Sequence, residues 1–419
     1  MNLFFIHEIF KWINSLHSII GRGQRLFKVT KILLGTILIV VTLSIYIAFL
    51  IPSGITIESN PVLYRTRRIL KLIANYHLGV FIYESIAFAF ILSGRLFERM
   101  KWKKQGLTKE ELKAKIYNKR RCMLGLLNII FIIFIVLYGS YKASNIEITS
   151  YDVSVDKDIE SLDSLNIVLI SDLHMGYNIG VDQISQMVEK VNSLNPDLVI
   201  LAGDIFDNEY EALENPDELK RLLSNIKSKY GCYGVWGNHD IEEKIIGGFT
   251  FTKEGMLKTH SDKMAQLIED ANITMLQEEG ILIADSIYLY GRPDYSRPGN
   301  AENSRLSPEE IAKTIDPQKL LIVIDHQPRE LDELALAGFD LDLGGHTHDG
   351  QFFPMNLTSR YITWRNSRGV LKVGNMYSIV TSGVGLFGPN MRIGTIAEIT
   401  QIRIRDGSFV TSTVPMARS

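Results

Sequence analysis

Three long apolar runs in the first third of the chain constrain its fold more strongly than any other feature. Residues 32–51 carry no charged side chain, and residues 122–141 consist mostly of Ile, Leu, Phe and Val. About 20 apolar residues are enough to cross the hydrocarbon core of a bilayer as a helix. A weaker run, residues 72–94, contains His77 and Glu84, and the cost of a charge in lipid predicts that Glu84 faces a neighbouring helix or is neutral. The runs predict a region with three membrane spans.

An earlier helix-like segment, residues 3–20, allows two interpretations. Its apolar side chains recur at helical spacing, while His7, Glu8 and Lys11 lie on the opposite side. An amphipathic helix at the membrane interface and a degenerate first span both fit this pattern.

The charges divide the chain into two parts of opposite character. Residues 1–141 contain 20 Lys and Arg against six Asp and Glu, whereas residues 142–419 contain 25 against 41. This division predicts a membrane region, residues 1–141, followed by a soluble domain, residues 145–419. The acidic domain lacks the positive surface that nucleic-acid binding requires, so nucleic acid is not an expected partner.

Basic residues in the loops between the apolar runs predict the orientation. Residues 95–121 carry 11 Lys and Arg against three acids, while residues 52–71 carry four Lys and Arg. Because cytoplasmic loops are enriched in Lys and Arg, the 95–121 loop is predicted to be cytoplasmic. The third run would then exit outward. We therefore expect a multi-pass protein of the cell membrane whose soluble domain is extracytoplasmic.

After Tyr141, short apolar runs alternate with polar stretches of helical periodicity, which predicts an α/β fold with many strands. Strands are expected at residues 145–155, 166–171, 198–202, 234–236, 281–284, 287–290, 320–324, 341–343, 378–381 and 398–404. Helices are expected at residues 181–194, 216–229 and 262–271, and loops at 246–260 and 294–308.

Polar clusters directly follow five of these expected strands. Ligands and catalytic groups collect at the carboxyl ends of strands in α/β sheets. Imidazoles and carboxylates bind Zn, Fe or Mn, and alternate residues of an extended segment share a face. The clusters therefore predict a metal site. They are Asp172-Leu173-His174, Gly203-Asp204-Ile205-Phe206-Asp207, Gly237-Asn238-His239-Asp240, Asp325-His326-Gln327-Pro328 and Gly344-Gly345-His346-Thr347-His348.

The series Asp-x-His, Gly-Asp-x-x-Asp, Gly-Asn-His-Asp, His-x-Pro and Gly-His-x-His resembles the calcineurin-like metallophosphoesterase superfamily over roughly residues 145–405. The segment from Thr381-Ser382-Gly383 to Met391-Arg392 is similar to the bacterial branch of membrane-attached or exported phosphoesterases. The resemblance implies a two-sheet β-sandwich flanked by helices, here preceded by an all-α transmembrane region. Asp349 departs from the pattern, because Gly usually follows the last His, and it is expected to add negative charge near the mouth of the site.

The resemblance also implies a role for each polar residue. His239 would lie beside the phosphoryl group and stabilise or protonate the leaving oxygen. Asp207 is the expected partner that orients His239, with Asp240 as the alternative. The remaining residues are the implied ligands of two divalent ions (Mn, Zn or Fe): Asp172, His174 and His348 for the first, Asn238, His326 and His346 for the second, and Asp204 as the bridge.

The implied reaction is hydrolysis of a phosphomonoester or phosphodiester by a hydroxide that bridges the two ions. The membrane region suggests a lipid-linked or cell-envelope substrate. An inactive binding or sensing module of the same shape is the alternative. Arg292, Arg297 and Arg392 are candidates for phosphate contact, against solvated charges as the competing interpretation. Residues 352–354 either line an apolar substrate groove or pack in the core.

Overall fold

The computed structural model describes two compact units. One comprises Met1–Pro52 and Asn60–Gly139, and the other comprises Ser53–Ser59 and Ser140–Ser419. Residues 107–117 of the 95–121 loop, most of the expected 246–260 loop and residues 299–304 lie outside the described residues. The described residues are 2–20, 23–52, 54–106, 118–155, 157, 164–242, 245–246, 249–250, 260–298 and 305–406.

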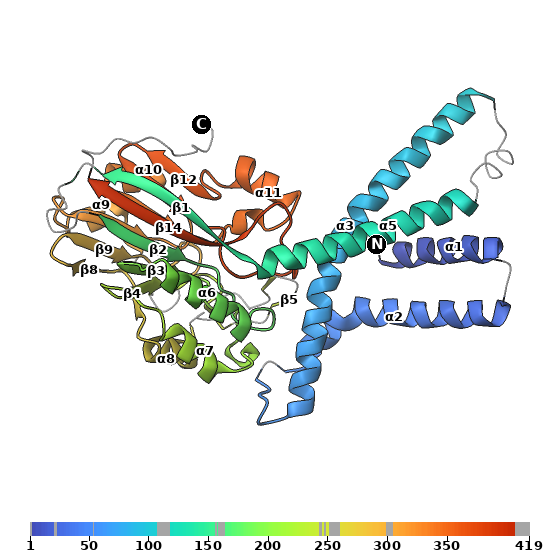
Figure 1. Cartoon of the computed structure of the whole chain (residues 1–419), viewed down its shortest axis with the longest axis horizontal. Helices are drawn as coiled ribbons and strands as arrows, with labels where there is room; N and C mark the ends of the chain where they lie inside the picture. The colour runs from blue at the N-terminus through green and yellow to red at the C-terminus, as the bar shows by residue number, and fades with distance from the viewer. Residues whose placement is uncertain are drawn as a thin grey trace. The chain divides into compact units, whose positions relative to one another are not determined.

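The first unit is helical, as expected (Figure 1). Within the described residues, three stretches are long and apolar enough to cross a membrane: Phe27–Ser44, Pro61–Glu98 and Arg120–Ser144. Glu84 accepts a hydrogen bond of 2.9 Å from the amide of Asn128, which lies in the helix Asn118–Ser144, so Glu84 faces a neighbouring helix. The helices are α1 (Asn2–Ile20), α2 (Gln24–Leu50), α3 (Pro61–Lys104) and α5 (Asn118–Ser144).

Helix α3 is much longer than the apolar run that predicted it. It spans 44 residues, whereas the run covers residues 72–94. Pro61 occupies its first position, where the missing N–H of proline costs nothing. Backbone hydrogen bonds continue the helix through its charged ends, where no apolar signal exists. α1 is a helix but is not among the candidate spans.

The second unit contains two six-stranded mixed sheets, which confirms the fold class (Figure 1). The first sheet has the order β1 (Ile146–Val155), β14 (Ala397–Asp406), β2 (Leu165–Ile170), β3 (Leu198–Ala202), β4 (Cys232–Val235) and β7 (Thr274–Met275). The second has the order β12 (Gly369–Val373), β13 (Met376–Val380), β11 (Leu341–Gly344), β10 (Leu320–Ile324), β9 (Ile287–Gly291) and β8 (Glu279–Ile283). A separate hairpin pairs β5 (Ile245–Ile246) with β6 (Phe249–Thr250).

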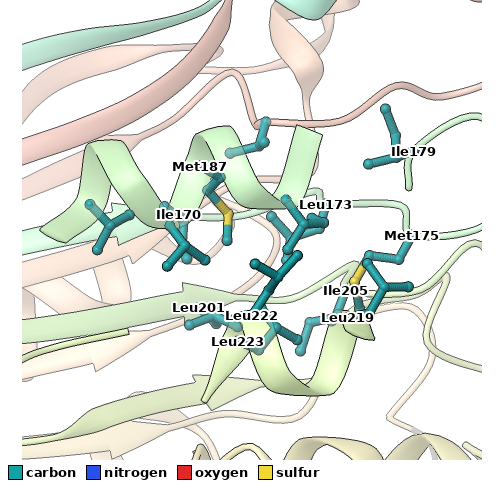
Figure 2. Packing of buried hydrophobic residues seen from close by; sticks show 14 of the residues in the cluster. Ile170, Leu173, Met175, Ile179, Met187, Leu201, Ile205, Leu219, Leu222 and Leu223 are labelled. Carbon is teal, nitrogen blue, oxygen red and sulfur yellow. The ribbon is translucent and has the colours of Figure 1, made fainter. Parts of the chain in front are cut away.

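Helices cover the outer faces of both sheets. α6 (Val181–Ser193), α7 (Pro216–Leu223) and α8 (Asp262–Asp270) pack on the first sheet. Figure 2 shows Met187 and Leu222 from this layer beside Ile170 and Leu201 of the strands. α9 (Pro308–Ala312) and α10 (Leu331–Leu336) cover the second sheet.

The two sheets bury a shared core between them, to which β2 and β10 both contribute. β3 and β10 are buried at every position because each lies between this core and a helical layer. This explains why their sequences read as continuous apolar runs rather than as alternating patterns.

Helix α7 ends earlier than its periodicity predicts. It stops at Leu223, whereas the pattern continues to residue 229. Asn192 of α6 accounts for the difference, because its side chain accepts from Lys227 N at 2.8 Å and donates to Asn225 O at 2.9 Å. These two bonds hold the chain in a non-helical path.

Candidate metal centre

All seven predicted metal ligands follow strands whose carboxyl ends meet at one edge of the domain. β2, β3 and β4 are parallel neighbours in one sheet, and β10 and β11 are parallel neighbours in the other. Five of the ligands are buried, while Asn238 and His346 are half-buried. The edge thus collects carboxylate, imidazole and amide side chains from both sheets: Asp172 and His174 after β2, Asp204 after β3, Asn238 after β4, His326 after β10, and His346 and His348 after β11.

The backbone at these positions is unusual. Non-glycine residues rarely adopt a positive φ, yet Asp172 (53°), His174 (46°), Asp204 (51°), His346 (68°) and His348 (47°) all do. Backbone hydrogen bonds between the loops hold this conformation, including His174 N to Asp204 O at 3.0 Å. Such strain, retained by surrounding structure, is typical of functional sites.

One group of potential ligands consists of Asp172, His174 and His348. The Nε2 atoms of His174 and His348 lie 3.0 Å apart, and His348 Nε2 lies 3.3 Å from Asp172 Oδ1. The three side chains therefore direct their ligand atoms at a common point.

The second group consists of Asp204, His326 and His346, with Asn238 beside them. His326 Nδ1 lies 2.7 Å from Ala202 O and donates its proton there, which leaves a lone pair on Nε2. That Nε2 atom faces Asp204 Oδ2 at 3.1 Å and Asn238 Oδ1 at 3.2 Å. His346 Nδ1 lies 3.3 Å from the same nitrogen.

The close approach of these acceptor atoms indicates that the residues fit a metal ion. Lone pairs that face one another repel unless a cation lies between them, and a divalent ion with nitrogen and oxygen ligands satisfies this arrangement. The pKa of His326 also indicates that this site favours positive charge. Burial alone would lower its pKa, but the adjacent Asp204 carboxylate raises the pKa well above the ordinary value. The residues fit a divalent metal ion.

Asp204 faces both groups at once. Its Oδ2 atom lies 3.7 Å from His174 Nε2 and 3.1 Å from His326 Nε2, while its Oδ1 atom accepts from His239 N at 2.7 Å. Burial would raise the pKa of Asp204, but His326 and His239 lower it well below the ordinary value. The carboxylate therefore stays ionised at the point where the two groups meet.

Two glycines allow the loops to approach this closely. A Cβ atom on Gly345 would lie 2.1 Å from Ser171 Oγ and 2.4 Å from Asp172 Oδ2. A Cβ atom on Gly237 would lie 2.2 Å from Asp204 Oδ1. Any side chain at either position would displace a carboxylate of the site.

His239 has a different orienting partner from the one expected. Its Nδ1 atom lies 2.5 Å from Asn208 Oδ1, whereas Asp207 and Asp240 were the predicted partners. Asp207 Oδ1 instead lies 3.7 Å from His174 Nδ1. Asp240 accepts from the backbone N–H groups of Phe206 and Gly237 at 2.8 and 2.7 Å.

We expect Asn208→Gly to lower kcat about tenfold, part of the 10²–10⁴-fold that a positioned acid contributes. Glycine is the suitable replacement because Asn208 has φ 60°, so the backbone keeps its conformation while the imidazole loses its acceptor. The measurement is kcat for aryl phosphodiester hydrolysis. An unchanged kcat would remove Asn208 from the positioning of His239. Gly180→Ala is a suitable control, because nothing lies within 4 Å of the added Cβ.

The three arginine candidates for phosphate contact differ in whether they can reach a phosphate. Arg292 is fully buried and donates to Asp325 Oδ2 at 3.1 Å, so it is not available to phosphate. Arg392 is also fully buried and donates to the carbonyls of Ser382 and Gly385 at 2.7 and 2.8 Å. Only Arg297 among the three lines a cavity at the domain edge where the candidate ligands meet, which we call the metal edge.

That cavity has a volume of about 410 Å³. Asp204, Asn238, His239, His346 and His348 form its polar floor. Its apolar wall consists of Phe352, Met355 and Phe387. Phe352 thus lines the groove rather than only packing in the core.

Asp349 does not carry its charge to the mouth of this cavity. It is fully buried, and its carboxylate forms an ion pair with Arg360, whose Nε donates to Oδ1 at 2.7 Å. The expectation that Asp349 adds negative charge at the mouth is therefore wrong, because burial and the ion pair with Arg360 keep its charge away from the mouth. Nothing in the sequence indicated that Arg360 lies beside Asp349.

Known proteins share this domain. The family described as calcineurin-like phosphoesterase matches residues 165–350. A "transmembrane protein with metallophosphoesterase domain" from Danio rerio is 28% identical over 280 residues, which cover 65% of this chain and 60% of that protein. An uncharacterised metallophosphoesterase of Campylobacter jejuni is 27% identical over 287 residues, covering 66% of this chain and 67% of that protein. The chain therefore carries a domain of the calcineurin-like metallophosphoesterase superfamily.

Proposed function

We propose that the protein is a membrane-anchored phosphoesterase that hydrolyses phosphomonoesters or phosphodiesters with two divalent ions. Residues 1–141 would form the anchor and residues 145–419 the catalytic domain. The observation that carries the proposal is the position of Asp204, whose Oδ2 atom faces His174 of one ligand group and His326 of the other. A single carboxylate between two such groups is the arrangement that a bridged metal pair requires.

Two groups of donor atoms would hold the two ions. Asp204 would contact both ions, which we expect to be Mn, Zn or Fe. When bound, the ions would supply a nucleophile at neutral pH and neutralise charge on the phosphoryl oxygens. Asp172, His174 and His348 would hold one ion, and Asn238, His326 and His346 would hold the other.

His239 is the residue that would handle a proton at the leaving oxygen. It lines the cavity, and Asn208 engages its Nδ1 atom, so Nε2 is the nitrogen available to substrate. A proton held there would neutralise the leaving alkoxide as its bond to phosphorus breaks. Arg297, which lines the same cavity, would bind a phosphate oxygen.

Metal removal tests the function directly. The purified full chain in detergent is expected to hydrolyse aryl phosphomonoesters or phosphodiesters with Mn²⁺, Zn²⁺ or Fe²⁺, and to lose that activity when a chelator is added. Re-addition of the metal should restore both hydrolysis and thermal stability, since an ion that binds only the folded state stabilises it.

The same experiment separates the enzyme from the inactive module. Metal-dependent stabilisation without hydrolysis of any ester would favour a binding or sensing module. The candidate spans and the relatives named as transmembrane proteins support membrane association. A multi-pass topology with an extracytoplasmic domain stays a proposal, and protease protection on intact cells tests it.

A further inference from the structure

The domain connects to its last candidate span at the metal edge. β1 runs parallel to β14, with Ile146 opposite Ala397, and β14 runs antiparallel to β2, with Thr400 opposite Leu169. The first residue of β1 therefore lies at the same edge as the carboxyl end of β2. That end leads directly into the ligand Asp172.

Hydrogen bonds tie the end of α5 to the site. Residues 140–144, the last turn of α5, belong to the same unit as the catalytic domain, and Ala143 is buried in its core. The Gln183 amide donates to Ala143 O at 3.1 Å and to Val384 O at 2.8 Å. Val384 N and Gly385 N in turn donate to the carbonyls of Ser171 and Asp172 at 3.0 and 2.7 Å.

The link between α5 and β1 is short. Only residue 145 separates α5 from β1. The apolar run of α5 ends at Tyr141, about 4.5 Å along the helix from Ser144 at 1.5 Å per residue. The metal edge thus begins within one helical turn of the apolar run, whereas the far end of the ten-residue β1 is about 33 Å away.

The segment that follows the candidate ligand His348 exposes several apolar side chains. They belong to a segment comprising Phe353, α11 (Met355–Thr358) and the π-helical turn η3 (Ser359–Thr363). Single exposed apolar residues are common, but a contiguous group marks an interaction surface. We call the five side chains the apolar rim: Phe353 (46% exposed), Met355 (49%), Leu357 (43%), Tyr361 (79%) and Ile362 (80%).

The apolar rim is built onto the metal site. Met355 lines the cavity itself. Trp364, which follows η3, packs its ring against the His346 ring with centroids 5.1 Å apart. Arg360 of η3 is paired with Asp349, the residue after His348. Met355, Arg360 and Trp364 therefore connect the segment that carries the rim to the cavity and to the candidate ligands.

We propose that the metal edge rests on the bilayer with the apolar rim in its interface, and that the substrate is the phosphoester head group of a membrane lipid. This inference rests on the proposed function. The phosphate of the head group would lie beside Arg297, and the adjoining apolar part of the lipid would lie along Phe352, Met355 and Phe387. Tyr, Ile, Leu and Met suit the interface, where tyrosine places its ring at head-group depth.

Lipid contact can be measured without reference to activity. The full chain, with its free cysteines replaced (Cys122→Ser, Cys232→Ala), is reconstituted in phosphatidylglycerol and phosphatidylcholine vesicles and labelled at Ile362→Cys with an environment-sensitive fluorophore. Spin-labelled lipids are expected to quench this label. Leu336→Cys is the matched control: it is 87% exposed and ends α10, which runs back to the opposite edge before β11.

A label at Ile362 that lipids do not quench would overturn the inference. If it is shielded from water but not quenched, a second copy or another protein covers the rim instead. Quenching at Leu336 equal to that at Ile362 would also contradict the proposed orientation.

Activity provides the second test. Tyr361→Ser combined with Ile362→Ser is expected to lower hydrolysis of phospholipid in vesicles by at least about tenfold, while hydrolysis of a soluble aryl phosphodiester stays unchanged. Equal losses on both substrates, or no loss on either, would overturn the inference. Failure of the unaltered protein to hydrolyse the aryl ester with any metal would instead refute the proposed function.

Discussion

Asp204→Asn is expected to reduce kcat/KM for phosphoester hydrolysis by on the order of 10³-fold, the upper range for removing one electrostatic group from a site. Asparagine preserves the shape of the side chain and can still accept from His239 N. It removes the negative charge that faces His174 and His326. With that charge gone, the group of His326 and His346 retains no anionic oxygen, and the other group retains only that of Asp172, so the metal stoichiometry should fall as well.

Asp342→Asn is a matched control for this prediction. Asp342 is fully buried on β11, and its Oδ2 atom accepts from Ser378 Oγ at 2.8 Å. Burial raises the pKa of Asp342 to about 8, so the group is protonated at pH 7 and asparagine resembles it closely. This variant should keep its activity and stability. Near wild-type hydrolysis with two bound metals in Asp204→Asn would exclude the bridging assignment.

The candidate ligands were predictable because two signals coincide at each of them. β3 and β10 were predicted to the residue, since strands buried on both faces read as uninterrupted apolar runs. A polar residue directly after such a run has to lie at a strand end. Five runs of this kind place Asp204 and His326 at one edge without any knowledge of the tertiary structure.

The hydrogen-bond partner of His239, Asn208, could not be predicted in this way. Asn208 reaches the imidazole because its own φ of 60° turns the chain after Asp207. Sequence spacing does not encode a single left-handed residue, and Asp207 carried the stronger family signal. Asparagine tolerates this conformation well, which is the only local indication that Asn208 occupies the turn.

The apolar rim was missed for a related reason. α11 has four residues and η3 has five, too few for helical periodicity to appear. The same residues could pack in a core, and only the fold shows that Tyr361 and Ile362 are about 80% exposed. Arg292 and Arg392 illustrate the reverse case, since loop arginines gave no sign that both would be fully buried.

His239→Ala is expected to lower kcat by about 10²–10⁴-fold for esters with alkyl leaving groups, the range for a lost general acid. An alkoxide is a poor leaving group and needs a proton as it departs. A nitrophenolate is stable as an anion, so the loss should be much smaller for a nitrophenyl ester. The measurement is kcat for both ester types at saturating metal.

The ratio between the two esters distinguishes proton donation from a structural role for His239. If the imidazole of His239 only maintains the packing of the site, both esters should lose activity equally, and that result would exclude the acid assignment. The backbone N–H of residue 239, which donates to Asp204 Oδ1, is retained in alanine and does not contribute to either loss. His260→Ala controls for the removal of a half-buried imidazole, because His260 stacks on Trp236 with centroids 4.6 Å apart and does not line the cavity. It should leave both rates unchanged. A loss confined to the alkyl ester in His239→Ala then requires a proton delivered from His239 to the departing oxygen.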